Sequence, residues 1–194
     1  MDTEGLEAVS MRRVAREVGV EAMSLYNHVQ DKDDLLGCVL EQVMKEFSYP
    51  PAIDGEDWLE QARALADAWR QLLHDHPGAL QLFAEHKTPM DSVDGMRPMD
   101  AALTTLRSAG LSDSDAVQAF HAIGGYIFGF VMMESGRLFG ALEADPRVFP
   151  QIPAGQLQSV SACISYLAEC DFDEQFEFGL DLMLEGLLAK VRSG

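Results

Sequence analysis

Helical periodicity recurs along nearly the whole chain, and it constrains the fold more than any other feature. Apolar residues return at spacings of three and four, as they do on one face of an α-helix. Alternating Val, Ile and Thr runs bounded by hairpin dipeptides, which are typical of strands, are almost absent. The pattern predicts an all-α protein. Its helices are expected near residues 10–17, 21–28, 32–47, 56–75, 78–86, 95–109, 113–138, 156–169 and 173–192.

Glycine and proline separate these helices, as expected of residues that end a helix or prevent one. Gly19 follows the first helix, and Pro50-Pro51 closes the third. The stretch from Gly140 to Gln156 holds three prolines and is predicted to be a loop. The composition shift at Pro50-Pro51 predicts two domains, a small head over residues 1–47 and a larger body over residues 52–194.

The composition suits a folded protein. Of the 194 residues, 47% are hydrophobic and 24% are charged, which is enough apolar material for a core. We expect no uncharged apolar run to approach the roughly 18 to 20 residues that span a bilayer. The acidic N-terminus lacks the order of a signal peptide. Cys38, Cys163 and Cys170 form no CxxC pair, so we expect reduced, partly buried thiols in a cytoplasmic protein with no membrane partner.

The net charge of −18 argues against a general nucleic-acid binder, but the charge is unevenly distributed. Residues 10–32 hold four Lys/Arg against three Asp/Glu, a balance of +1. Most of the acidic residues therefore lie outside this short segment. An acidic body lowers weak, non-specific attraction to phosphate.

The same segment contains two short helical patterns joined by a glycine. Val14 and Val18 are apolar at helical spacing, Gly19 supplies a tight turn, and Val20 is expected to fill the corner between the helices. A second helix of about eight residues follows over 21–28.

In that second helix Leu25 and Val29 are expected to face inward. The residues left on its other side are polar or aromatic, namely Ser24, Tyr26, Asn27 and His28. So short a helix with so much polar surface is a poor core element, but it suits the major groove of DNA. The alternative is a plain helical hairpin whose exposed residues are only solvated.

This stretch strongly resembles the head of TetR-family transcriptional regulators. The carriers are Met11-Arg12, Val14-Ala15, Val18-Gly19-Val20, Ser24-Leu25-Tyr26-Asn27-His28-Val29, Lys32 and Leu35-Leu36. The resemblance implies a homodimer on a palindromic double-stranded DNA operator, with one helix-turn-helix head on each half-site. The DNA contacts it implies are Ser10, Arg12, Ala22, Met23, Ser24, Tyr26, Asn27, His28 and Lys32. Of these, Tyr26 and Lys32 would hold phosphate, whereas Asn27 and Ala22-Met23 would face base edges.

One departure from the family concerns the start of the head. The family places a full helix before this motif, whereas here only MDTEGLEAV precedes it. We therefore expect a head whose first helix is missing, in which Val14, Leu25 and Val29 lose a packing partner.

The body resembles the tetracycline-repressor branch of the family. The carriers are Trp58, the DHPGA turn from Asp75 to Ala79, AGLS from Ala109 to Ser112, GGYIFGFVMMES from Gly124 to Ser135, and FEFGLDLMLEGL from Phe176 to Leu187. Alignment to that branch implies a ligand pocket formed by Ser48, Leu65, Trp69, Phe83, His86, Met99, Leu103, His121 and Gly125. Core packing is the alternative for each of them, and His121 could be a satisfied core histidine.

The departures within this pocket bear on the ligand. Tetracycline repressors hold magnesium with a histidine and grip the drug with polar residues, and here those positions resemble Phe83, Ser48 and Leu65. We therefore predict an apolar or aromatic effector, with no metal and no cofactor. Glu134 matches an acidic residue of the family that reaches toward the partner's magnesium site. Here it is interpreted either as a residue that has lost this role or as a dimer contact.

The last predicted helix is apolar on two sides. Phe176, Leu180 and Leu187 lie on one side, and Phe178 and Leu182 on another. Both sides must be covered. Several glycines in the helix near 113–138 suggest close approach of another backbone or of a ligand. We expect these two helices and their symmetry mates to form a four-helix dimer interface, and the alternative is a monomer with a thick core.

Together these implications predict a ligand-responsive dimeric repressor that a small apolar or aromatic effector releases from DNA. The alternative is a small-molecule-binding helical dimer that does not bind DNA. An enzyme would need a convergent acid/base or nucleophile set, and the sequence shows none, so we expect no enzymatic activity.

Overall fold

The computed structural model describes residues 5–51, 57–85, 92–136, 157–168 and 171–193. Every regular element in these ranges is helical, which confirms the all-α prediction. In chain order they are a 3₁₀ helix η1 (Leu6–Ala8) and the α-helices α1 (Met11–Val18), α2 (Ala22–Leu25), α3 (Lys32–Lys45), α4 (Trp58–Asp75), α5 (Pro77–Glu85), α6 (Val93–Ser108), α7 (Asp113–Glu134), α8 (Gln158–Ala168) and α9 (Phe172–Ser193).

The chain forms two compact units, residues 1–128 and 129–194. The division falls within α7. The predicted division near Pro50-Pro51, between a DNA-binding head and a ligand-binding body, differs from this structural division and stays a prediction. The predicted loop from Gly140 to Gln156 lies outside the described residues.

The turn between α1 and α2 has the geometry that its sequence predicts. The Ser10 side chain caps α1 by accepting a hydrogen bond from the backbone N–H of Arg13 at 3.4 Å. Gly19 ends the helix in the left-handed region at φ 74°, where a residue with a Cβ is strained.

The second helix is shorter than predicted. The structure gives α2 as Ala22–Leu25, followed by a turn, whereas the sequence pattern extends to residue 28. The backbone N–H groups of Asn27 and His28 bond to carbonyls three residues earlier, at 3.3 and 2.9 Å. Such bonds tighten the chain and end the α-helix, which hydrophobic periodicity does not reveal.

The apolar face of the head is only partly covered. Val29 is buried, but Val18 is 60% exposed and Val20 is 44% exposed. The expectation that Val20 fills the corner between the helices is therefore wrong. Met11 and Ala15 of α1 are also buried, and the described residues before α1 add only η1.

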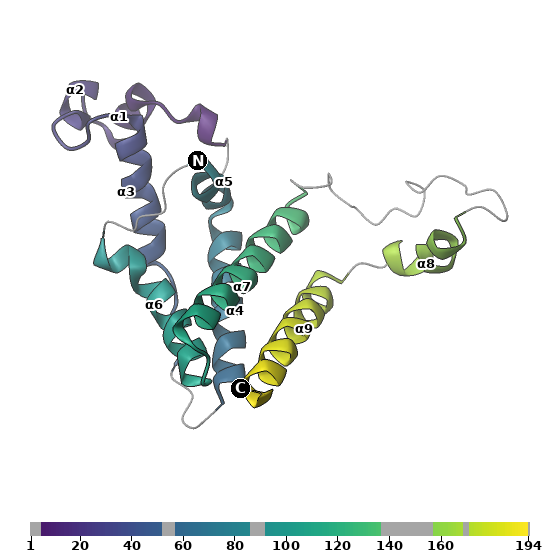
Figure 1. Cartoon of the computed structure of the whole chain (residues 1–194). Helices are drawn as coiled ribbons and strands as arrows, with labels where there is room; N and C mark the ends of the chain where they lie inside the picture. The colour runs from purple at the N-terminus through teal and green to yellow at the C-terminus, as the bar shows by residue number, and fades with distance from the viewer. Residues whose placement is uncertain (1–4, 52–56, 86–91, 137–156, 169–170, 194) are drawn as a thin grey trace. The chain divides into compact units, whose positions relative to one another are not determined.

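A cluster of leucines forms the core around α3. Leu36 and Leu40 of α3 pack with Leu6 of η1 and Leu82 of α5, and Phe83 packs against the cluster. The short segment before α1 thus contributes a buried side chain that the sequence did not reveal. α5 and α6 both pack on α3, while α1 and α2 lie near its N-terminal end (Figure 1).

The long helix α7 corrects one expectation. Residues 116–133 contain no Asp, Glu, Lys or Arg, and the 22-residue helix is long and apolar enough to cross a membrane by length and composition. The expectation that no apolar run approaches such a length is therefore wrong. A core helix of a soluble protein passes the same test, and one face of α7 lines the cavity described below.

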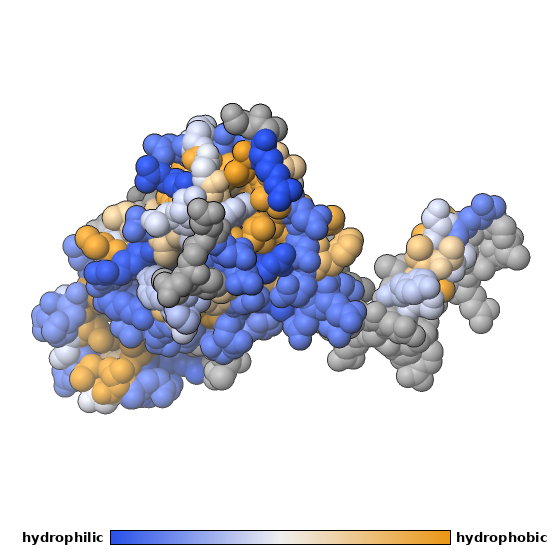
Figure 2. All heavy atoms as spheres, turned by 90° about the horizontal axis from the view of Figure 1, so that it is seen from below, coloured by the Kyte–Doolittle hydropathy of each residue, from blue (hydrophilic) through white to orange (hydrophobic). Residues whose placement is uncertain are grey.

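In the second unit, α9 has one buried and one exposed apolar side. Phe176, Leu180 and Leu184 are fully buried, and the Phe176 ring lies 5.3 Å from that of Phe130. On the other side Phe178 is 68% exposed and Leu182 is 58% exposed. Figure 2 shows, on one face of the protein, hydrophobic patches set in a mainly hydrophilic surface.

The thiols differ from expectation in their exposure. Cys38 and Cys163 are both free and exposed, so the expectation of partly buried thiols is wrong for these two. Cys170 lies outside the described residues.

Candidate functional site

The residues predicted to read DNA lie mostly on the surface of the head. Ser24, Tyr26, Asn27 and His28 are exposed in or directly after α2, Met23 is 72% exposed, and Ala22 is half-buried. Arg12 is exposed on α1. The structure therefore presents a polar and aromatic surface around one short helix, and this surface is exposed within the described part of the chain.

Two of the predicted DNA residues already have a structural contact. The hydroxyl of Ser10 caps α1. The Lys32 ammonium, half-buried at the start of α3, donates to the carbonyl of Leu6 at 3.4 Å. A lysine carries three N–H donors, so this bond orients Lys32 and leaves donors for a phosphate.

A cavity of about 270 Å³ lies within the first unit, between α3, α4, α5, α6 and α7. Met44 of α3 forms part of its wall, as do Leu65 of α4 and Ile127 of α7. Helix–helix cavities of this kind are common binding sites for small molecules.

Five of the nine predicted ligand residues line this cavity, namely Leu65, Trp69, Phe83, Met99 and His121. Ser48, Leu103 and Gly125 are not among the lining residues, and His86 lies outside the described residues. Whether any of them binds a ligand stays a prediction. The alternative of a buried core histidine is wrong for His121, because its side chain is exposed.

Two of the residues outside the cavity are the immediate neighbours of lining residues. Ala102 and Gly124 line the cavity, whereas Leu103 and Gly125 do not. Consecutive residues point about 100° apart around a helix, so neighbours in the sequence need not share the face that lines the cavity.

Helical spacing could have found several lining residues that the sequence reasoning missed. On α7 the cavity face consists of Phe120, His121, Ile123, Gly124, Ile127 and Phe128. Residues three, six and seven positions after His121 are Gly124, Ile127 and Phe128, which lie on the same face of the helix. Met44 carries no such signal, because its helix belongs to the predicted head, residues 1–47, rather than to the body.

The chemistry of the cavity is almost entirely apolar. Among its described lining residues only Trp69, Thr105 and His121 have a nitrogen or oxygen atom in the side chain. The described lining contains no Asp, Glu, Lys or Arg. No group of three or more His, Cys, Asp or Glu is placed to hold a metal ion in the described part of the chain. The absence of a metal in function stays a prediction.

Aromatic rings connect the cavity to the end of α3. Phe47, buried two residues after α3, lies 5.2 Å from Trp69 between ring centroids. Trp69 in turn lies 6.1 Å from both Phe83 and Phe128, and those two rings are 5.1 Å apart. The cavity wall therefore includes Phe83, which also packs against the leucine cluster of α3.

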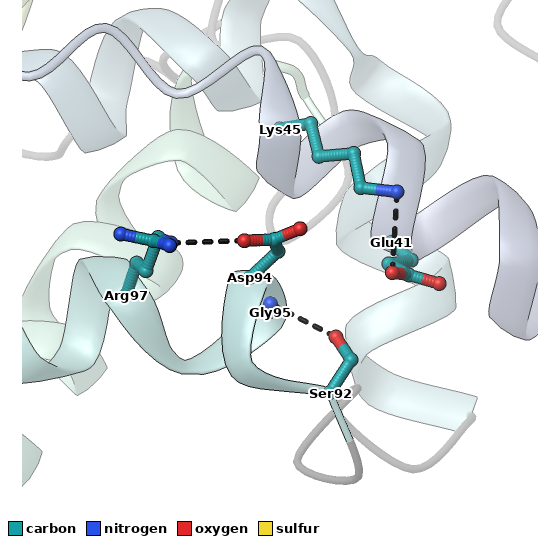
Figure 3. Close-up of polar contacts among 6 residues, drawn as sticks. All are labelled: Glu41, Lys45, Ser92, Asp94, Gly95 and Arg97. Atoms are coloured by element: carbon teal, nitrogen blue, oxygen red, sulfur yellow. Dashed lines mark hydrogen bonds and ion pairs between the residues drawn. The ribbon is translucent and has the colours of Figure 1, made fainter.

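Polar contacts surround the place where α6 meets the C-terminal end of α3 (Figure 3). Ser92 caps α6 by accepting from the N–H of Gly95 at 3.0 Å, and Arg97 donates to Asp94 at 2.9 Å. The hydrogen bond to Asp94 raises the pKa of the Arg97 guanidinium, while burial raises the pKa of the nearby Tyr49 hydroxyl. These contacts hold the start of α6, a helix that lines the cavity.

Comparison with protein families identifies both parts of the chain. Residues 1–38 match the model described as bacterial regulatory proteins of the tetR family, and residues 50–191 match the tetracyclin repressor-like C-terminal domain. The second match alone covers more than half of the chain. The chain belongs to the TetR family.

Individual relatives agree with this assignment. The TetR-family chain is 32% identical to the HTH-type transcriptional repressor DrrR1 of Streptomyces coeruleorubidus, over 96% of this chain and 72% of that protein. It spans only 56% of a similar HTH-type transcriptional regulator of Saccharopolyspora erythraea, at 31% identity over 70% of this chain.

Among solved structures, apo ActR from Streptomyces coelicolor is 29% identical, with a TM-score of 0.85, over 99% of this chain and 90% of that one. ActR has also been solved in complex with actinorhodin. The relatives and the family model are transcriptional regulators rather than enzymes. The protein is accordingly a TetR-family repressor with a DNA-binding head of the helix-turn-helix type and a ligand-binding body.

Proposed function

We propose that this TetR-family protein is a cytoplasmic homodimer that binds a palindromic operator and leaves it when a small apolar or aromatic effector enters the cavity. The observation that carries the proposal is that one helix, α3, takes part in both sites. Lys32 opens α3 beside the predicted DNA surface, and Met44, near its other end, lines the cavity.

The packing on α3 supports a route from the cavity to the head. Phe83 lines the cavity and also packs against the cluster of Leu36 and Leu40 on α3. A ligand that moves Phe83 must therefore shift packing on α3. We propose that α3 has a second position with a different affinity for the ligand, so that ligand binding shifts the population between the two positions.

Displacement of the head explains release. A dimer holds its two heads on half-sites about one helical turn apart, roughly 34 Å. A small change in the position of α3 alters that separation, so both heads no longer fit the same face of the DNA.

The relatives support this reading of effector and target. ActR is described in complex with actinorhodin, and BioQ, 26% identical over 97% of this chain and 90% of that one with a TM-score of 0.66, in complex with its double-stranded DNA operator. The apolar and aromatic lining of the cavity here favours an apolar or aromatic effector.

The dimer interface is proposed from the exposed side of α9. Phe178 and Leu182 are large apolar residues left uncovered in the single chain. A Cβ built at Gly125 or Gly129 of α7, or at Gly186 of α9, meets nothing within 4 Å in the described structure, which leaves room for a second backbone. We propose that α7 and α9 of two copies form a four-helix interface.

Fluorescence anisotropy with labelled DNA that flanks the protein's own gene tests the proposal. We expect specific binding that weakens with salt, because phosphate contacts release counterions, and that weakens further when an aromatic effector is added. Absence of any specific binding would contradict the repressor and favour a ligand-binding dimer without a DNA role.

The matched variant is Phe83→Leu. Leucine keeps most of the volume, at a cost of less than about 1.5 kcal/mol, but it removes the ring between the cavity and the leucine cluster. We expect unchanged DNA binding without ligand and a smaller loss of DNA affinity on adding ligand. Phe172→Leu, which replaces an aromatic residue of the second unit, serves as the control.

A further inference from the structure

The side chains that line the cavity constrain the charge and polarity of the ligand that can bind there. We propose that it selects an uncharged aromatic molecule with a single polar edge, and that His121 binds this edge. This inference rests on the proposed function and specifies the effector class of the same site.

The aromatic side chains of the wall define the apolar part. The ring centroids of Trp69, Phe83 and Phe128 lie within 6.1 Å of one another. Phe83 meets both other rings edge-to-face, whereas Trp69 and Phe128 are tilted by 49°. Rings in such edge-to-face arrangements accept a further aromatic ring with favourable geometry. Met96 and Met99 add flexible, polarisable surface that adjusts to the outline of a flat molecule.

The polar atoms of the lining are few, and they are not equivalent. The Thr105 hydroxyl, on a buried residue, already donates to the carbonyl of Ala101 at 3.0 Å. The Trp69 indole lies among the rings of Phe47, Phe83 and Phe128 and can only donate. A ligand hydroxyl placed among those rings would lose its water without full compensation.

His121 is the remaining polar side chain, and its position differs. It lines the cavity and is also exposed, so it lies where the cavity meets solvent. An imidazole can donate through one nitrogen and accept through the other. A ligand whose polar edge lies at His121 keeps a hydrogen bond and part of its hydration, while its apolar body fills the interior.

The described lining offers no Asp, Glu, Lys or Arg to a charged ligand. Burying an ionised carboxylate or ammonium without a partner is far more costly than burying a hydroxyl. The cavity is therefore expected to reject the anion of an aromatic acid and to accept the corresponding phenol.

Isothermal titration calorimetry with three probes of one ring system tests this inference. The probes are 2-naphthol, naphthalene and 2-naphthoate, in slightly alkaline buffer. We expect 2-naphthol to bind about five-fold more tightly than naphthalene, as one hydrogen bond allows. We expect 2-naphthoate to bind at least about tenfold more weakly than 2-naphthol.

Variants at His121 then identify the polar partner. His121→Leu should reduce the preference for 2-naphthol over naphthalene to about one, while naphthalene binds as before. His121→Gln keeps a donor and an acceptor and should retain most of the preference. Gln118→Leu is the control, because Gln118 is exposed on the same helix, is absent from the lining, and bonds to Ser114 at 3.3 Å.

Three outcomes would overturn the inference. A preference for 2-naphthol that survives in His121→Leu would assign the polar contact to another group, such as the Trp69 indole. Equal binding of 2-naphthoate and 2-naphthol would refute the selection against charge, and failure of all three probes would refute the aromatic class. If 2-naphthol binds as expected but leaves the protein on its operator, this inference stands and the proposed release by effector fails.

Discussion

Individual side chains around α2 determine how the head would read DNA. Met23, Asn27 and Tyr26 are exposed, and no core packing explains their chemistry. Their types were evident from the sequence. Their exposure also follows from the pattern, because Leu25 and Val29 occupy the inward positions of the same short segment.

Asn27 provides the first test at this scale. An asparagine can bond in a bidentate manner to adenine, so Asn27→Ala should weaken binding to the operator by about 1–3 kcal/mol. Binding to unrelated DNA should hardly change, because it depends on phosphate contacts. Competition anisotropy with operator and unrelated duplexes measures both affinities.

Tyr26→Phe is the control for Asn27. It removes one hydroxyl that we assign to phosphate, so it should weaken operator and unrelated DNA by a similar factor. If Asn27→Ala also weakened both DNAs equally, Asn27 would be a phosphate contact and not a base reader.

Cavity residues show why single positions are harder to predict than elements. The sequence placed Leu103 and Gly125 in the site, but their neighbours Ala102 and Gly124 line the cavity. One position along a helix changes the direction of a side chain by about 100°. Alignment to distant relatives does not define the direction of each side chain, and only the packed structure shows which residues line the cavity.

At the scale of elements, the turn between α1 and α2 depends on one backbone conformation. Gly19 has φ 74°, and a Cβ there would meet nothing within 4 Å. The cost of a side chain is therefore backbone strain alone. The sequence identified this turn correctly, because glycine after a helical pattern is typical of a left-handed cap.

Gly19→Ala should therefore destabilise the protein by roughly 1–2 kcal/mol. The matched control is Gly37→Ala in α3, where a Cβ also meets nothing within 4 Å and the backbone is helical. That change should stabilise the helix by about 0.5–1 kcal/mol. Urea unfolding measures both, and effects of equal sign would contradict the assignment of strain to Gly19.

The whole molecule is proposed to act as a dimer, and a substitution on the exposed side of α9 tests this. Phe178→Glu places a charge on a surface that is 68% exposed in the single chain. It should leave the folded monomer stable, since exposed substitutions usually change stability by no more than about 0.5 kcal/mol, but it should prevent association.

Light scattering coupled to size-exclusion chromatography gives the oligomeric state. We expect a dimer for the unaltered protein and a monomer for Phe178→Glu, with loss of tight operator binding because one head holds only one half-site. Glu185→Gln, on an exposed position of the same helix, should remain dimeric. A monomeric unaltered protein would contradict the proposed interface.

The sequence alone determined the features that depend on local chemistry. Helical class, the Gly19 turn, the order of the elements and the polar surface of the head follow from periodicity, caps and side-chain type over short stretches. Resemblance of two segments to known regulators also indicated the family, because its motif is local. Each of these properties depends on residues close together in the chain.

Only the tertiary structure decided which distant residues meet. Leu6 packs with Leu36, Leu40 and Leu82, and Met44 of α3 lines a cavity with residues of α6 and α7. Val18 and Val20 are exposed although their pattern is that of core residues. The reason is physical. An apolar pattern in the sequence indicates that a face gains from burial, but the packing of the whole unit determines which residues cover that face.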